Sequence, residues 1–112
     1  MAFTTATVVS VKQGTEQFRG VFSEMWQATL TVNPASVAAG AEDTGTFTIP
    51  GLALGDMVLG LSAGVDLTID SEVLAYVSAA NTLTIRISNL NGSSALDLAS
   101  STWKVVIGRP AF

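Results

Sequence analysis

Histidine and cysteine are both absent from the 112 residues of this chain. Without cysteine the chain forms no disulfide and offers no thiolate to a metal ion. Without histidine it lacks the commonest general base, the commonest transition-metal ligand and the one side chain that normally titrates near neutral pH. These absences exclude most hydrolase and metalloenzyme mechanisms, so we expect a protein that is not an enzyme and uses no cofactor.

Charged residues are scarce as well, at 12% of the chain against about 25% in an ordinary soluble domain. The longest apolar stretch, residues 52–65, is interrupted by Asp56 and falls short of the roughly 20 residues that cross a bilayer. Residues 1–5 have neither the basic nor the apolar region of a secretory signal. The net charge of −4 and five scattered basic residues make nucleic acid a poor partner. We therefore expect no membrane and no nucleic-acid binding.

A surface poor in charge consists largely of Thr, Ser, Ala, Gly and Asn. Such a surface costs little to desolvate against another protein, which favours assembly. The alternative is a neutral, weakly soluble monomer.

Alternation of apolar and polar residues runs through most of the chain and predicts β-strands. The runs are rich in Thr, Val and Ile, and turn residues such as Pro50-Gly51 and Asn91-Gly92 separate them. No convincing amphipathic helix is present. About eight short strands at this spacing predict an all-β fold, an antiparallel, jelly-roll-like β-sandwich, with a closed barrel as the second choice. The predicted strands are 5–11, 24–32, 46–49, 56–61, 65–70, 73–78, 82–87 and 103–107.

We expect a single domain with a sandwich body over residues 24–112 and an N-terminal strand and arm over residues 1–23. The segment 12–22 shows no clear periodicity and reads as an irregular arm. Its phenylalanines either close one end of the core or dock the arm onto a neighbouring subunit. The candidate assembly contacts are Phe3, Phe18, Arg19, Phe22 and Phe112.

Carboxylates are the remaining candidates for chemistry. Asp66 and Asp70 share a strand face but lie about 13 Å apart, too far for a two-carboxylate hydrolytic site. Asp70 and Glu72 could bind a hard cation with a backbone carbonyl, yet the regular ligand spacing of an EF-hand loop is missing. We interpret these side chains as solvated surface carboxylates, and we expect no metal site.

Three other patterns also favour structure over chemistry. Ser101 and Lys104 match a Ser-x-x-Lys spacing, but on a strand they point to opposite faces. The glycine-rich stretch 51–64 precedes no helix, so it makes no phosphate cradle. Trp26 and Trp103 alternate with apolar neighbours, which indicates core positions; sugar-binding platforms are the alternative.

Six turn and strand segments stand out together: residues 31–40, 45–50, 54–56, 76–83, 91–92 and 98–105. These segments resemble those of a group of small structural proteins encoded among the virion genes of tailed bacteriophages. The resemblance covers about residues 28–107, and none of its positions is a chemical site.

The resemblance implies a capsid cement or decoration protein, whose partner is the major capsid protein. Such proteins are commonly β-rich trimers at the local three-fold axes of the head. It also implies synthesis in the host bacterial cytoplasm and a final place on the virion surface. The alternative function is a receptor- or glycan-binding β module of a tail or head fibre, which requires an exposed Trp26 or Trp103.

Overall fold

The computed structural model describes residues 4–13, 21–67 and 70–111, with only the backbone described for residues 4–13. All regular elements in these ranges are strands. The same ranges contain no helix long and apolar enough to cross a membrane. The seven strands are β1 (Thr4–Gln13), β2 (Phe22–Asn33), β3 (Glu42–Thr48), β4 (Met57–Ser62), β5 (Ser71–Ala79), β6 (Thr82–Asn89) and β7 (Ser101–Pro110).

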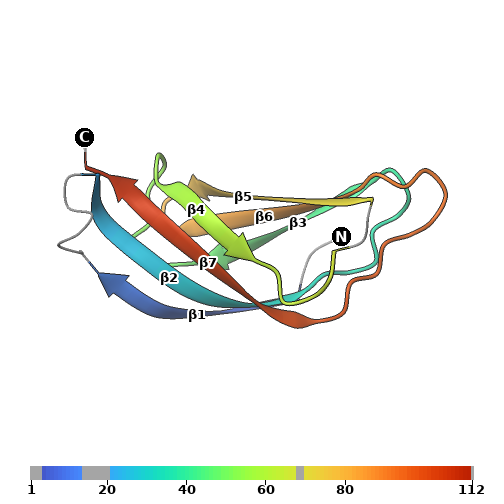
Figure 1. Cartoon of the computed structure of the whole chain (residues 1–112), viewed down its shortest axis with the longest axis horizontal. Coiled ribbons are helices and arrows are strands. Elements are labelled where there is room, and N and C mark those ends of the chain that lie inside the picture. The colour runs from blue at the N-terminus through green and yellow to red at the C-terminus, as the bar shows by residue number, and fades with distance from the viewer. Residues whose placement is uncertain (1–3, 14–20, 68–69, 112) are drawn as a thin grey trace.

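The strands form two antiparallel sheets that lie as two layers (Figure 1). One sheet has the order β1-β2-β7-β4 and the other the order β3-β6-β5. The two sheets share no ladder within the described residues, so the fold is sandwich-like and not a closed barrel. The prediction of an all-β antiparallel fold is confirmed for this part of the chain.

The hydrophobic core lies between the two sheets and comes from the alternating residues that the sequence singled out. In β2 the buried positions recur at every second residue from Trp26 to Val32, and in β7 from Trp103 to Ile107. Trp26 pairs with Ile107 and Leu30 with Trp103, so the two tryptophans occupy different levels of the same central strand pair. Both tryptophans are 1% exposed, which confirms the core interpretation of these residues.

The expected strand over residues 65–70 is wrong for its described part. Residues 65–67 lie in a bend and an irregular connection, while residues 68–69 lie outside the described residues. Val65 and Leu67 are partly buried against the core. Their alternation therefore reflects a connection that packs along the side of the core. Every second side chain of this connection is partly buried, although its described backbone pairs with no strand. The described chain has seven strands where we expected about eight.

The N-terminal segment is part of the sandwich where it is described. Strand β1 pairs with β2 from Thr4 opposite Asn33 to Gln13 opposite Met25, with one register shift between Val9 and Val11. The backbone of Thr4–Gln13 is thus a regular edge strand, and Phe22, expected in the irregular arm, begins β2.

Two long connections meet at one end of the molecule (Figure 1). Val37, between β2 and β3, exchanges backbone hydrogen bonds of 2.8 Å with Leu96, between β6 and β7. The buried Asn89 donates from Nδ2 to the carbonyls of Val37, Ala38 and Ser94 at 2.9–3.3 Å. The two N–H groups of this amide thus serve three carbonyls, of which that of Val37 also accepts from the Leu96 amide and that of Ala38 from the Ala41 amide.

Candidate functional site

Phe22 is the one candidate assembly contact whose side chain is described, and it is half-buried. A Cβ placed on Gly108 would lie 2.8 Å from Cδ1 of Phe22 and 3.0 Å from Cδ1 of Leu59. The Phe22 ring therefore rests on the flat backbone of β7 beside Leu59. The other four candidates, Phe3, Phe18, Arg19 and Phe112, lie outside the residues whose side chains are described.

The carboxylates considered for catalysis or cation binding do not converge. Asp66 is exposed, and Oδ2 of Asp70 accepts a 3.0 Å hydrogen bond from the side chain of Asn91. Glu72 lies on the outer face of β5 and is exposed. Among the described residues, no group of three acidic side chains could hold a metal ion.

The Ser101–Lys104 pair has no catalytic geometry. The hydroxyl of Ser101 accepts a 2.8 Å hydrogen bond from Nε1 of Trp103, on the core-facing side of β7. Lys104 is exposed on the opposite face of the same strand. The serine therefore satisfies a buried indole, and no base lies beside it in this pair.

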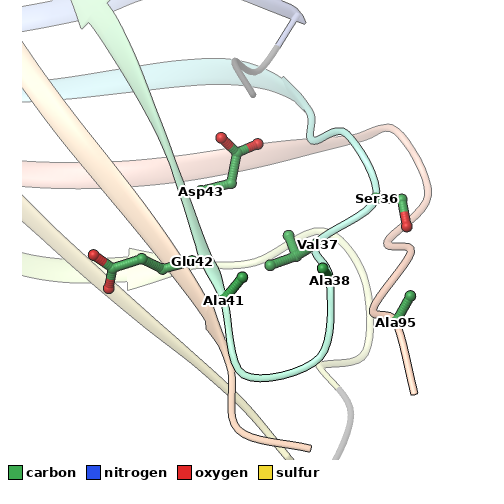
Figure 2. A pocket seen from close by; sticks show the side chains of 7 residues that line it. All are labelled: Ser36, Val37, Ala38, Ala41, Glu42, Asp43 and Ala95. Atoms are coloured by element: carbon green, nitrogen blue, oxygen red, sulfur yellow. The ribbon is translucent and has the colours of Figure 1, made fainter. Parts of the chain in front are cut away.

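A hollow of about 380 Å³ opens where the connection before β3 turns into that strand (Figure 2). Its lining is small or apolar except for two acidic residues: Ser36, Val37, Ala38, Ala41, Glu42, Asp43 and Ala95. Figure 2 shows the carboxyl groups of Glu42 and Asp43 pointing away from each other. Asp43 is 4% exposed on the inner face of β3, and its Oδ1 accepts from the Thr44 amide at 3.1 Å. Adjacent residues that diverge in this way do not act on one substrate atom.

A second hollow of about 350 Å³ lies on the outer face of the three-stranded sheet. Glu42 and Glu72 flank Ser88 of the central strand β6, one on each side. Arg86 lies on the same face of β6, two residues before Ser88. Its Nε is 4.0 Å from Glu42, and its guanidinium carbon is 5.9 Å from the ring centre of Tyr76. This is a shallow, mixed-charge surface, and it suits protein contact better than a small molecule.

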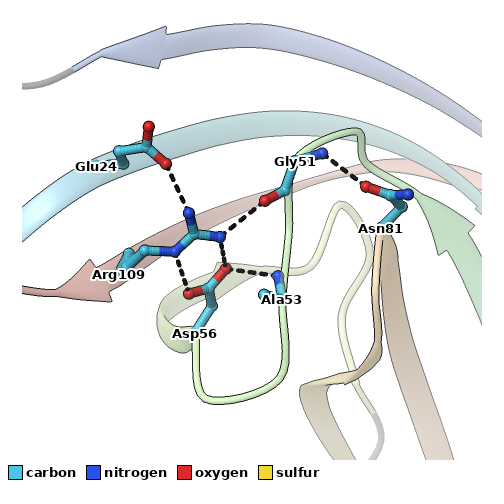
Figure 3. Close-up of polar contacts among 6 residues, drawn as sticks. All are labelled: Glu24, Gly51, Ala53, Asp56, Asn81 and Arg109. Atoms are coloured by element: carbon cyan, nitrogen blue, oxygen red, sulfur yellow. Dashed lines mark hydrogen bonds and ion pairs between the residues drawn. The ribbon is translucent and has the colours of Figure 1, made fainter.

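The most elaborate polar arrangement is a network around Arg109, at the end of β7 (Figure 3). The guanidinium donates to both carboxylate oxygens of Asp56, to Glu24 and to the Gly51 carbonyl, at 2.8–2.9 Å. Its carbon lies 5.1 Å from the ring centre of Trp26, within the range of a cation–π contact. We call Glu24, Gly51, Asp56 and Arg109 the Arg109 network.

The contacts of Asp56 within the Arg109 network favour the ionised form of its carboxyl group. Desolvation acts to raise the pKa of Asp56, but the hydrogen bonds from Arg109 and from the Ala53 amide, with the charge of Arg109, outweigh it. The pKa of Asp56 is therefore lowered below its usual 3.8. A carboxylate that stays ionised beside a bidentate arginine is a structural anchor, since a general acid needs a raised pKa.

The Arg109 network joins the loop after β3 to strands β2 and β7. Asp56 accepts from the Ala53 amide at 2.9 Å, and the Asp56 amide donates to the Ala53 carbonyl at 3.1 Å. Gly55, with φ of 97°, completes this turn in a conformation that favours glycine. The turn holds Leu54 at its tip, where the side chain is 71% exposed. The network thus fixes an apolar residue on the surface.

Large exposed apolar side chains lie on the loop before β4 (Leu54), on β4 (Met57 and Leu59) and on β5 (Leu74 and Tyr76). Two more, Val21 before β2 and Leu90 after β6, are exposed elsewhere. Strands β4 and β5 contact each other across the two sheets. The edge of the sandwich formed by β4 and β5 is the candidate interaction surface. Sequence reasoning missed it because single exposed apolar residues within alternating strands look like core residues.

No protein-family model, no curated protein and no solved structure matches this chain.

Proposed function

We propose that this protein is a capsid decoration (cement) protein of a tailed bacteriophage, which binds the outer surface of the head and stabilises the shell. The observation that carries the proposal is the set of exposed apolar side chains on β4, on β5 and on the loop before β4. An exposed apolar patch marks an interaction surface. The resemblance of residues 28–107 to phage structural proteins supplies the setting.

In this proposal the protein acts by binding alone, without enzymatic activity. Its partners are the major capsid protein and two further copies of the chain, arranged as a trimer. Contacts repeated around a symmetry axis raise the affinity of each weak patch for the shell. The protein is made in the host bacterial cytoplasm and ends on the surface of the virion.

The nested strand order supports a jelly-roll-like classification of the sandwich. Strand β7 lies between β2 and β4, and β6 lies between β3 and β5, while consecutive strands from β2 to β5 alternate between the sheets. A jelly roll, which usually has eight strands, has a comparable order because it is a long antiparallel ribbon wrapped around a core.

The alternative, a glycan-binding module, gains no support from the tryptophans. Trp26 and Trp103 are buried between the sheets, so neither can act as a stacking platform for a sugar.

Two measurements on the purified chain test the proposal. The first is its mass in solution, and the second is its co-sedimentation with empty heads of the phage that encodes it. We expect a trimer that binds the heads and raises the temperature at which they disrupt. A monomer that does not sediment with the heads would overturn the proposal.

A further inference from the structure

The two sheets present four edge strands, and they differ in how well they are protected from pairing with another chain. An edge strand exposes a row of unpaired amide and carbonyl groups that can accept a further strand. Proteins usually block such edges with bulges, charged side chains (above all lysine), proline or an inward-pointing charge, and an internal glycine weakens a strand. The edges in the described chain are β1 and β4 in one sheet, and β3 and β5 in the other.

Three of the four edges carry such features. The register of β1 shifts between Val9 and Val11, and that of β4 shifts between Val58 and Gly60. Strand β3 contains Gly45 and directs the buried carboxylate of Asp43 inward. Each of these features disfavours a regular added strand.

Apart from the acidic Glu72, strand β5 has none of them over most of its length. From Ser71 to Val77 its register against β6 is continuous, and the only shift lies between Val77 and Ala79, next to the hairpin turn. The strand contains no lysine, arginine, proline or glycine. Within the described residues, no strand pairs with its other edge. Residues 72–77 therefore offer six regular positions for an added strand.

The side chains of β5 are incompletely covered on both faces. On the outer face Leu74 is 52% exposed and Tyr76 is 37% exposed. On the inner face Val73 and Ala75 pack against the core but are only partly buried. An added strand would cover apolar surface on both faces of this edge.

The charge at this edge favours a basic partner. No hydrogen bond or ion pair from the described residues reaches the carboxylate of Glu72, which lies on the outer face two residues before Leu74. The nearest guanidinium in the sheet, on Arg86, is engaged with Glu42 and Tyr76. Glu72 thus presents an uncompensated negative charge beside free backbone groups.

We propose that the free edge of β5 accepts an extended strand of the major capsid protein, which pairs along residues 72–77 and places a lysine or arginine opposite Glu72. Apolar side chains of the same strand contact Leu74 and Tyr76 on the outer face. This inference rests on the proposed function and names the surface that binds the shell. Backbone hydrogen bonds supply affinity in this mode of recognition, and the alternating side chains supply specificity.

A second copy of the chain is a poorer occupant of the edge. Strand β5 contains no basic residue, so two copies paired through β5 leave both Glu72 carboxylates without a cation. Each copy also carries a net charge of −4. The charge complementarity therefore points to a foreign strand.

Two substitutions with matched controls test the inference by co-sedimentation with empty heads. Leu74→Lys places a lysine on the free edge, whereas Thr46→Lys makes the same change in charge on the outer face of β3. Glu72→Gln removes the proposed ion pair, whereas Asp97→Asn removes an exposed carboxylate from the connection before β7, away from this sheet. We expect each β5 variant to bind about tenfold or more weakly, and both controls to bind as the unchanged chain does.

Hydrogen exchange of the unchanged chain, alone and on heads, gives an independent readout. We expect alternate amides within residues 72–77 to exchange rapidly in the free protein and to be protected on the heads. Normal head binding by Leu74→Lys, or no added protection of these amides, would overturn the inference while leaving the proposed function intact. Protection of these amides in the free protein, lost on dilution, would identify a second copy as the occupant and also overturn it. Failure of the unchanged chain to bind heads would instead refute the proposed function.

Discussion

Arg109 and Asp56 lie 53 residues apart in sequence and meet through two hydrogen bonds of 2.9 Å each, from Nε to Oδ1 and from Nη2 to Oδ2. The Asp56 side chain is 3% exposed, whereas that of Arg109 is 32% exposed. This bidentate pair is the link between the loop after β3 and the end of β7. Its partly buried position makes it stronger than an ordinary surface ion pair.

Asp56→Asn is expected to lower the free energy of unfolding by about 2 kcal/mol, the usual contribution of a hydrogen bond to a charged group. The amide keeps the shape of the side chain but loses the charge and one of the two acceptors for Arg109. Urea denaturation measures the change. The matched control is Asp97→Asn, because Asp97 is exposed and should change stability by less than about 0.5 kcal/mol. Equal effects of the two substitutions would contradict the role of the Arg109 network.

The stabilisation from Asp56 should depend on pH in a defined direction. Because its pKa is lower in the folded chain than the usual 3.8, the folded state favours the ionised carboxyl. The contribution is complete above the pKa of the unfolded chain and is lost as the pH falls through the lower folded value. The difference in unfolding free energy between the unchanged chain and Asp56→Asn should stay constant above about pH 5 and shrink below pH 3.8. A difference that persists undiminished at pH 2 would contradict this assignment.

Strands were predictable from this sequence wherever alternation coincided with a sheet partner. The alternation from Trp26 to Val32 and from Trp103 to Ile107 correctly indicated both the strands and the buried face. The same signal failed at residues 65–67, because a connection that runs along the core also buries every second side chain. Periodicity reports which side chains are buried, and it does not report whether the backbone is paired.

The Arg109 network and the β5 edge could not be predicted from local patterns. Arg109 contacts residues 53 and 85 positions away, and its partners follow only from the order of the strands. Whether a strand lies at an edge is likewise a property of topology, since Val73–Ser78 reads in sequence as a central strand. The absence of lysine, proline and glycine from β5 is visible in the sequence. It becomes informative only when the strand is known to be an edge.

Substitution by alanine should change the stability of the fold in opposite ways at two glycines. Gly64 lies in the connection between β4 and β5, and Gly60 lies in β4. A Cβ on Gly64 would overlap the backbone carbonyl of Thr102, which cannot move without disturbing β7. Gly64→Ala should therefore destabilise the fold by about 3 kcal/mol. Gly60 has no atom within 4 Å of a Cβ, so Gly60→Ala should be neutral or stabilise by about 0.5 kcal/mol. Thermal unfolding of the two variants checks the contrast, which fails if both melt alike.

Intrinsic fluorescence should report two buried tryptophans. Trp26 and Trp103 are both 1% exposed, so emission of the folded protein should be blue-shifted, poorly quenched by iodide and unchanged by added sugars. Unfolding in urea should shift the emission to the red. Red-shifted emission of the folded chain that responds to a sugar would favour the glycan-binding alternative over the decoration protein.

Asn89 offers the sharpest test of how the loop end of the sandwich is held. Its Nδ2 group donates to three backbone carbonyls, and its Oδ1 accepts from the Asn91 amide at 3.0 Å. Asn89→Asp keeps the size of the side chain and the acceptor for Asn91. It replaces the donor with an oxygen that faces the carbonyls of Val37, Ala38 and Ser94, so a buried charge meets three partial negative charges. We expect a loss of about 3 kcal/mol or more near neutral pH.

The loss in Asn89→Asp should be partly recovered in acid, because a protonated carboxyl regains one donor for these carbonyls. This direction is opposite to that expected for Asp56, so unfolding measured at neutral and acidic pH separates the two mechanisms. Asn89→Ala is the matched comparison: it removes the donor and the acceptor without adding charge, and its defect should not recover in acid. If both Asn89 variants have the same pH dependence, the carbonyls are not held by the Asn89 donor, and the two long connections are joined by the backbone hydrogen bonds of Val37 with Leu96 and of Gly40 with Asn91.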